Sequence, residues 1–331
     1  MDALLARRQL IRASACAALV LPVIAGAQSL NAPRRVFVIM SGLPETNGHY
    51  MAAFADAMRL LGWAEGKNLV LEVRWAAGRY EAFERFAAEA LAGNADLVVA
   101  PTTPAVRSAQ RLIKGIPIVF AVCLDPVGDG LVASLDRPGA NTTGTSTLSA
   151  VLMGKRLELL KECVPSIKSV AVLNDIGARY NPGVLGRVLD AARVLGIRLS
   201  VFDVTATGDF DLAFAAIKQQ QLDGLFVMDG PFLARSQTDI VARTTSARLP
   251  AVYPIDSYAE NGGLMVYGVS YPNQYRRAAD YVDRILKGAR PSDLPVEQPT
   301  TFELIVNLKA ARALPLTIPR IVLLRANRII E

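Results

Sequence analysis

Hydrophobic and polar residues are arranged along the chain in two kinds of segment. Runs of consecutive apolar residues, such as "RVFVIM" at 35–40 and "IPIVFAV" at 116–122, are typical of strands that are buried on both faces. Between such runs, apolar residues recur at helical spacing, as at Met51, Phe54 and Met58, until Gly62 ends the helix. The pattern predicts alternating strands and helices, with parallel sheets covered by helices.

This pattern runs along the chain twice. Strands are predicted at 35–40, 69–73, 95–100 and 116–122, and again at 169–173, 197–204, 223–228 and 250–253, with helices of the second run near 183–195, 209–219 and 232–247. The two runs also share an order of short motifs, such as "RLLG" at 59–62 and "RVLG" at 193–196. We therefore predict an α/β fold of two similar, doubly wound parallel-sheet lobes.

Polar residues follow the predicted strands where each strand ends. Because ligands of doubly wound sheets bind at the carboxyl ends of the strands, these residues are candidate ligand contacts. In the first lobe they are Ser41, Thr102, Thr103 and Asp125, and in the second they are Asn174, Asp229 and Tyr258.

Each of the stronger candidates has a second, purely structural interpretation. Thr102 and Thr103 precede a helix that begins near Pro104, so they could hold a carboxylate, or Thr103 could only cap that helix. Asp229 could receive an ammonium group or cap the helix after Pro231. Tyr258 could stack on an aromatic ligand or pack inside the crevice.

Composition narrows the function. The chain has 331 residues, 52% of them hydrophobic, and a formal net charge of +6. Its basic residues are scattered among acidic ones, so nucleic-acid binding is not predicted. His49 is the only histidine and no Cys-x-x-Cys pair exists, so neither a zinc site nor a histidine-based catalytic triad is predicted. We expect no metal and no cofactor.

The N-terminal 27 residues are typical of an export signal. A basic start is followed by an apolar run of about a dozen residues and by the small residues Ala25 and Ala27, after which cleavage is expected. The run is shorter than the roughly 20 residues of a membrane-spanning helix. Arg7 and Arg8 resemble a twin-arginine signal, although Ala6 stands where Ser or Thr is usual; the general secretory route is the alternative.

Cleavage after Ala27 would leave a protein with modest positive charge and two cysteines. The remainder has 33 Lys and Arg against 29 Asp and Glu, a net charge of +4. Export permits a disulfide between Cys123 and Cys163, but two separate buried thiols are the favoured interpretation for a large domain.

The stretch "GANTTGTS" at 139–146 departs from a phosphate-binding loop at one position. Thr145 stands where that motif requires Lys, which removes the charge that contacts the β- and γ-phosphates. The stretch lies where the first run of strands and helices ends and the second begins. A nucleotide site is therefore not predicted.

Longer segments resemble a known family over nearly the whole chain after residue 35. They include "LLGWAEGKNLVLEVRWAAGRYEAFERFAAEAL", "GIPIVFAVCLDPVGDGLVASLDRPGANTTG", "GKRLELLKECVP" and "GGLMVYGVSYPNQYRRAADYVDRILKGARPSDLPVEQPTTFELIVNLKAARAL". These resemble ABC transporter substrate-binding proteins related to tryptophan and tyrosine uptake. Departures fall in the ligand loops, as at Thr102, where the family often has Gly, and at Cys123 and Leu124.

The resemblance implies a type I periplasmic-binding-protein fold, with two lobes joined by a multi-crossing hinge. Lobe one is expected at 34–145 plus about 268–299, and lobe two at 146–267 plus about 300–331. The resemblance also places Asn141 and Thr143 beside the cleft, near the hinge, and they join the candidate ligand contacts.

The function hypothesis is a monomeric periplasmic receptor that captures a small ligand and delivers it to an ABC permease in the inner membrane. The ligand is expected to be an amino acid or a related small carboxylate, held by Ser41, Thr102 and Thr103, with Asp229 and Asp125 facing its amine or a hydroxyl. An exported hydrolytic enzyme using Asp125, Asp229 or Asp256 is the alternative. A ligand-sensing transcription regulator would need a DNA-binding element, and an export signal stands at the N-terminus instead.

Overall fold

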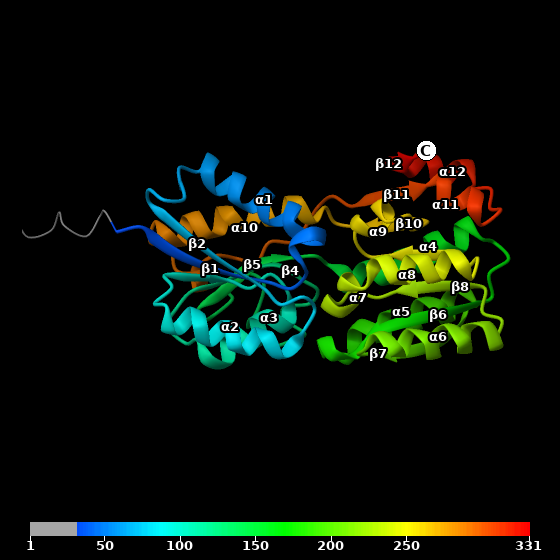
Figure 1. Ribbon diagram of the computed structural model, residues 1–331, viewed down its shortest axis with the longest axis horizontal. Helices are drawn as coiled ribbons and strands as arrows, with labels where there is room; N and C mark the ends of the chain where they lie inside the picture. Colours follow the sequence, from blue (N-terminus) through cyan, green and yellow to red (C-terminus); the bar gives the residue numbers. More distant parts are fainter. Residues whose placement is uncertain (1–31) are drawn as a thin grey trace, which may run out of the picture. The chain divides into compact units, whose positions relative to one another are not determined.

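The computed structural model describes residues 32–331, except for the side chains of Ser149 and Ala150. Residues 34–331 form one compact unit with two parallel-dominated sheets (Figure 1). The predicted signal segment and its cleavage point lie outside the described residues. The predicted α/β class with two doubly wound lobes is confirmed.

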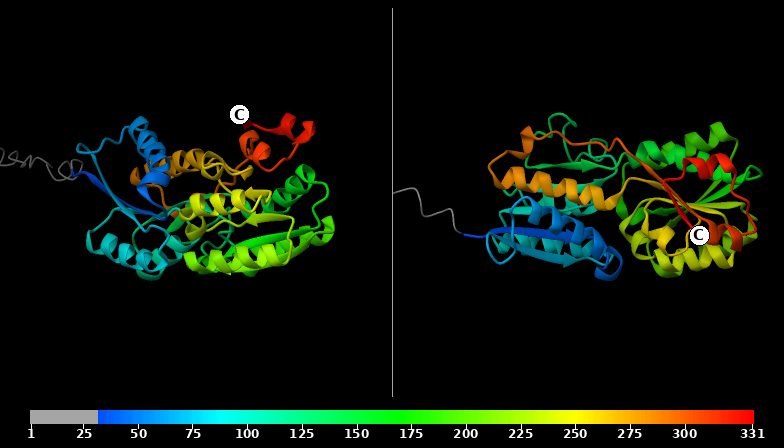
Figure 2. Two further views of the ribbon diagram at one scale, coloured as in Figure 1. Left: turned by 45° about the vertical axis from the view of Figure 1, so that its right-hand side comes forward. Right: turned by 90° about the horizontal axis from the view of Figure 1, so that it is seen from above.

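The first lobe is built on a five-stranded parallel sheet in the order β2-β1-β3-β4-β5. Helices α1 and α10 cover one face of this sheet and α2 and α3 cover the other (Figures 1 and 2). Its elements are β1 (Arg34–Met40), α1 (Pro44–Leu60), β2 (Leu69–Trp75), α2 (Tyr80–Ala92), β3 (Leu97–Val99), α3 (Thr103–Leu112), β4 (Ile118–Cys123), β5 (Thr142–Ser146) and α10 (Tyr271–Leu286).

The second lobe is built on a seven-stranded sheet in the order β12-β11-β10-β9-β8-β6-β7, in which only the β10–β11 pair is antiparallel among the described strands. Its elements are α4 (Ser149–Cys163), β6 (Ser169–Asp175), α5 (Pro182–Leu195), β7 (Arg198–Val204), α6 (Thr207–Gln219), β8 (Gly224–Val227), α7 (Pro231–Arg235), α8 (Gln237–Ser246), β9 (Ala251–Tyr253), α9 (Ser257–Glu260), β10 (Met265–Gly268), β11 (Glu303–Asn307), α11 (Leu308–Ala313), α12 (Arg320–Arg325) and β12 (Arg328–Ile330). Short 3-10 turns occupy Ile176–Ala178 and Pro291–Asp293.

Two details of the predicted elements were wrong. The strands β2 and β7 lie at sheet edges and are largely half-exposed or exposed. The helix predicted over 232–247 is two helices, α7 and α8, which meet at Ser236. The exposure of these strands and the break in this helix depend on which elements pack beside them, and a run of apolar residues carries no information about that packing.

The segment at 139–146 is mostly a buried strand. Thr142–Ser146 forms β5 at the edge of the first sheet, and all of its residues are buried. Gly144 has φ +150°, and a Cβ there would lie 2.0 Å from the carbonyl oxygen of Phe120. Only glycine fits this close approach of two strands.

The chain passes between the sheets beside β5. It leaves the first lobe after β5, returns after β10 to form α10, and leaves again before β11. The last passage lies along β5, since the Ser146 amide donates to the Glu297 carbonyl at 2.8 Å and Thr145 bridges to Glu297. Adjacent connecting segments of this kind restrict relative movement of the lobes to a hinge bend.

Candidate functional site

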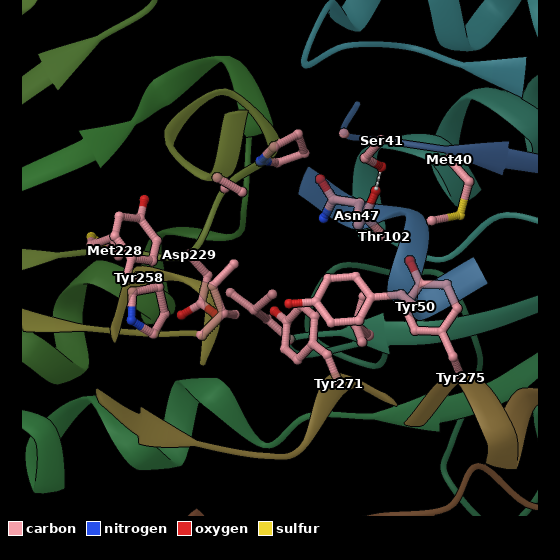
Figure 3. Close-up of a pocket in the computed structure, with 18 of the residues that line it drawn as sticks. Met40, Ser41, Asn47, Tyr50, Thr102, Met228, Asp229, Tyr258, Tyr271 and Tyr275 are labelled. Atoms are coloured by element: carbon pink, nitrogen blue, oxygen red, sulfur yellow. Dashed lines mark hydrogen bonds between the residues drawn. The ribbon is translucent and has the colours of Figure 1, made fainter. Parts of the chain in front are cut away.

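A cavity lies between the carboxyl ends of the two parallel sheets and is lined by both lobes (Figure 3). The first lobe contributes Met40, Ser41, Gly42, Asn47, Tyr50, Thr102, Val122, Leu124, Tyr271 and Tyr275. The second lobe contributes Tyr180, Met228, Asp229, Gly230, Pro231, Ala234, Pro254, Ile255 and Tyr258. The lining is mainly apolar and aromatic with a few polar groups, as in most small-molecule sites.

The polar groups of the first lobe come from the ends of adjacent strands. β1 and β3 are paired in parallel, with Val38 opposite Val99, so the residues that follow them meet at one edge. The hydroxyl oxygens of Ser41 and Thr102 lie 2.8 Å apart in a mutual hydrogen bond (Figure 3). Thr102 is also the N-cap residue of α3, and its side chain makes no capping hydrogen bond. Two hydroxyls, one of them at the N-terminus of a ten-residue helix, therefore lie together at one end of the cavity.

The charged group of the second lobe is Asp229, which follows β8. Its side chain is 3% exposed, and its Oδ2 accepts a hydrogen bond from Nη1 of Arg156 at 2.6 Å. Arg156, from α4, is 1% exposed. A buried carboxylate beside a buried guanidinium forms a pair without net charge, which reduces the cost of removing Asp229 from water.

Tyrosine rings form much of the remaining wall. The ring of Tyr50 stacks on that of Tyr275, with centroids 5.5 Å apart and an interplanar angle of 17°. Tyr258 stacks on Tyr253 behind the wall, at 4.7 Å, and its hydroxyl donates to the Leu233 carbonyl. Burial raises the pKa of the Tyr50, Tyr258 and Tyr275 hydroxyls, so these side chains stay neutral.

Hydrogen bonds join the lobes on either side of the cavity. The Tyr50 hydroxyl donates to Asp256 Oδ1 at 2.8 Å, and the Tyr80 hydroxyl donates to Asp175 Oδ2 at 2.6 Å. Three further contacts are Arg107 Nη1 to the Arg179 carbonyl at 2.9 Å, the Asn181 amide to Asp129 Oδ1 at 2.8 Å, and Arg235 Nη1 to the Ala77 carbonyl at 3.2 Å. In this arrangement the lobes are in direct contact around the cavity.

Four of the predicted site residues line the cavity: Ser41, Thr102, Asp229 and Tyr258. The hydroxyl of Tyr258 donates to the Leu233 carbonyl of the same lobe, so this side chain also packs inside the crevice. Asp229 does not cap α7, since the N-cap residue of that helix is Gly230. Thr103 does not cap α3 either, since Thr102 occupies the N-cap position.

The other predicted site residues lie outside the lining and bond within the protein. The Thr103 hydroxyl donates to Asp129 Oδ2 at 3.4 Å, and Asp125 accepts from the Gly128 amide at 2.9 Å. Asn141 Nδ2 donates to the Ile116 carbonyl, and the buried Thr143 hydroxyl donates to the Leu294 carbonyl, both at 2.7 Å. Asn174 Nδ2 donates to Asp203 Oδ1 at 2.6 Å. The polar groups of these residues are therefore engaged in hydrogen bonds within the protein.

Sequence reasoning missed several residues at the cavity. The predicted ligand contacts do not include Tyr271, Tyr275, Asn47 or Tyr180, which all line the cavity. Arg156 carried a usable signal, because it stands on α4 among the buried apolar residues Met153, Leu157 and Leu160. A charge at such a position is rarely left without a partner.

The remaining candidates are placed away from the cavity lining. His49 lies on α1 and is exposed. Cys123 and Cys163 are buried free thiols, and burial raises the pKa of Cys163 to about 12.

Over residues 32–331, no group of three or more His, Cys, Asp or Glu side chains could hold a metal ion. Among the helices described, none is long and apolar enough to cross a membrane.

Comparisons with known proteins match this architecture. The family described as "ABC transporter substrate binding protein" matches residues 37–330. A tyrosine-binding protein of Clostridioides difficile (strain R20291) is 24% identical over 261 residues, which cover 79% of this chain and 75% of that protein.

Solved structures show the same fold. A conserved domain protein from Vibrio cholerae is 29% identical with a TM-score of 0.85, covering 90% of this chain and 100% of that one. An ABC domain from Streptococcus pneumonia in complex with L-Trp is 22% identical with a TM-score of 0.83 and the same coverage. A ligand-free, open substrate binding protein from Clostridium difficile is 22% identical with a TM-score of 0.64, covering 90% of this chain and 99% of that one.

The family match spans nearly all the described residues, and the two lobes enclose a cavity of the kind that small ligands occupy. The comparisons give no support to the alternative of a hydrolytic enzyme. Members of this family bind small ligands and work with an ABC permease, typically outside the cytoplasm. The chain belongs to the ABC transporter substrate-binding protein family.

Proposed function

We propose that this chain captures an aromatic amino acid between its lobes and releases it, chemically unaltered, to an ABC permease. The observation that carries the proposal is the composition of the cavity. It combines a hydroxyl pair on one lobe, a carboxylate on the other, and tyrosine rings between them.

Each part of an amino acid has a matching group in the cavity. The Ser41 and Thr102 hydroxyls and the N-terminus of α3 suit a carboxylate, because they are hydrogen-bond donors at the positive end of a helix dipole. Asp229 suits an ammonium group. The rings of Tyr50, Tyr258 and Tyr271 offer flat apolar surface for an aromatic side chain.

Two relatives support this ligand class. One relative is a tyrosine-binding protein, and one solved neighbour is a complex with L-Trp. They support the proposal because the cavity of this chain, considered by itself, also offers groups that suit an aromatic amino acid.

The mechanism of capture is closure of the lobes. The TM-score is higher for the L-Trp complex than for the ligand-free, open neighbour, at equal identity, and hydrogen bonds join the lobes around the cavity. These observations support a closed arrangement. A ligand that contacts both lobes would favour it over an open one by its differential affinity.

The finer points of the proposal concern the protein in the cell. It is a monomer that is exported, cleaved after about Ala27 and retained in the periplasm, with no nucleic-acid partner. Its lobes comprise 34–145 plus about 268–299, and 146–267 plus about 300–331. The movement between them takes place at the connecting segments beside β5.

Calorimetry with L-tyrosine, L-tryptophan and L-phenylalanine tests the ligand assignment. Asp229→Asn and Thr102→Val should each weaken binding roughly tenfold to a hundredfold, the usual effect of losing a hydrogen bond to a charged group. Asn174→Ala, at a strand end outside the lining, is the control and should bind as the wild type does. Unchanged affinity in both site variants would contradict the assignment, and recovery of a chemically altered ligand would contradict a binding function.

A further inference from the structure

Arg156 is the largest fully buried side chain described, and it lies directly behind the cavity. Its Nη1 donates to Asp229 Oδ2 at 2.6 Å, its Nε to the Tyr267 carbonyl at 2.7 Å, and its Nη2 to the Pro254 carbonyl at 3.4 Å. These acceptors lie at or just after the ends of β8, β10 and β9, which are adjacent in the second sheet. One planar guanidinium therefore links the cavity ends of three neighbouring strands.

The charge of Arg156 matters as much as its hydrogen bonds. Among the described residues that line the cavity, Asp229 is the single charged side chain (Figure 3). Without Arg156, its carboxylate would leave the enclosed site with a net negative charge. Charges act strongly over short distances where water is excluded, so that imbalance would attract any cation that fits the cavity.

We propose that Arg156 determines the charge class of the ligand, by balancing Asp229 so that the cavity favours a zwitterionic aromatic amino acid over the corresponding amine. This inference rests on the proposed function, because it concerns the same cavity. Arg156 acts as a positioning residue and as a counter-charge. Asp229 is the group that meets the ligand's ammonium.

The two ligand types differ in one group. L-tyrosine and tyramine share the aromatic ring and the ammonium group, but only L-tyrosine has a carboxylate. The ring contributes nearly equally to both affinities, so the ratio of the tyramine Kd to the L-tyrosine Kd isolates the effect of charge. Arg156 raises this ratio, because a buried cation favours the carboxylate and disfavours the extra positive charge of the amine.

Calorimetry on the purified full chain should show this change of preference. In Arg156→Gln the ratio should fall by about tenfold or more, the effect of a close charge at intermediate dielectric. Arg156→Lys should keep the ratio within about threefold of wild type, because it retains the charge and loses the planar hydrogen-bonding geometry. Lys155→Gln is the matched control: it removes one positive charge from the next residue, in a half-exposed ion pair with Glu158, and should leave the ratio unchanged.

A purely structural role predicts a different result. In that case Arg156→Lys would behave like Arg156→Gln, and the ratio would not change in either variant. A folded Arg156→Gln protein with the wild-type ratio would overturn the proposal.

The reverse substitution keeps the proposal testable if Arg156→Gln does not fold. Asp229→Asn preserves the shape of the side chain and leaves the cation of Arg156 unbalanced. The preference for L-tyrosine over its deaminated analogue, 3-(4-hydroxyphenyl)propionate, should then fall by about tenfold or more. An unchanged preference would overturn the proposal.

Thermal unfolding separates this inference from the ligand assignment, because it needs no ligand. Arg156→Gln should lower the Tm, and adding Asp229→Asn should restore part of the loss, since a buried ion pair costs most when one partner is removed. If the double variant has as low a Tm as Arg156→Gln, the charge-balance proposal is overturned. If the wild type binds none of these compounds but the restoration is observed, the ligand class of the proposed function is wrong and the charge balance is supported.

Discussion

Two tyrosine–aspartate hydrogen bonds join the lobes, and they differ in their surroundings. Tyr50 of α1 donates to Asp256, which precedes α9, and Tyr80 of α2 donates to Asp175, which ends β6. Because α1 and α2 cover opposite faces of the first sheet, the two bonds lie on different sides of that lobe. In both, the first lobe supplies the hydroxyl and the second supplies the carboxylate.

The difference lies in what else each pair touches. Tyr50 lines the cavity and stacks on Tyr275, so it would contact a ligand bound there. Tyr80 lies outside the lining and packs edge-on against Phe83. In the proposed mechanism, the same chemical contact would serve recognition and closure at Tyr50, but closure alone at Tyr80.

The two carboxylates also differ. Asp256 accepts from the Ser257 amide as well as from Tyr50. Asp175 is 2% exposed, and its Oδ2 accepts from Tyr80 and from the Phe232 amide, while its Oδ1 has no partner within the described part of the chain. Burial raises the pKa of Asp175 from 3.8 to about 6.

The largest expected effect is the pH dependence that Asp175 imposes on stability. A carboxyl group whose pKa is raised in the folded state stabilises the protein below its unfolded pKa, and that contribution is lost as pH rises through about 6. The rise from 3.8 to about 6 corresponds to about 3 kcal/mol. Part of this contribution is already lost at pH 4, so Asp175→Asn should gain about 2.5 kcal/mol relative to wild type between pH 4 and pH 8.

Urea unfolding at several pH values measures this difference. Asp190→Asn, at an exposed surface ion pair, is the control and should follow the wild-type profile. If Asp175→Asn also follows that profile, Asp175 is solvated in solution and the lobes are not closed over it.

A smaller effect is expected from Tyr80→Phe. The variant removes a hydrogen bond to a buried carboxylate, which costs about 2 kcal/mol. Because Tyr80 is not part of the cavity lining, every ligand should lose affinity by a similar factor, roughly tenfold or more. Calorimetry against several amino acids tests the uniformity, and a change in the order of ligand affinities would show that Tyr80 acts on recognition.

The smallest effect is expected from Tyr50→Phe. Asp256 keeps its bond to the Ser257 amide, so the loss should be about 1 kcal/mol or roughly fivefold in affinity. Here the loss should differ from one ligand to another, because the altered ring is part of the wall. Equal losses for all ligands would remove the distinction between the two tyrosines.

The sequence by itself determined the two-lobed α/β fold and part of the cavity. Apolar runs mark buried parallel strands, and the rule that ligands bind at their carboxyl ends located Ser41, Thr102, Asp229 and Tyr258. This succeeded because a residue's position at a strand end depends mostly on its neighbours in the chain. The same rule also selected Asp125 and Asn174, because it does not report which polar groups are already bonded within the protein.

Only the tertiary structure decided which distant groups meet. Arg156 reaches Asp229 from 73 residues away in the chain, and Tyr80 meets Asp175 from 95 residues away. Tyr275 reaches the cavity because α10 packs on α1 of the first lobe. Such meetings depend on how whole helices and sheets pack and on how the lobes close, and local hydrophobic periodicity carries no information about either.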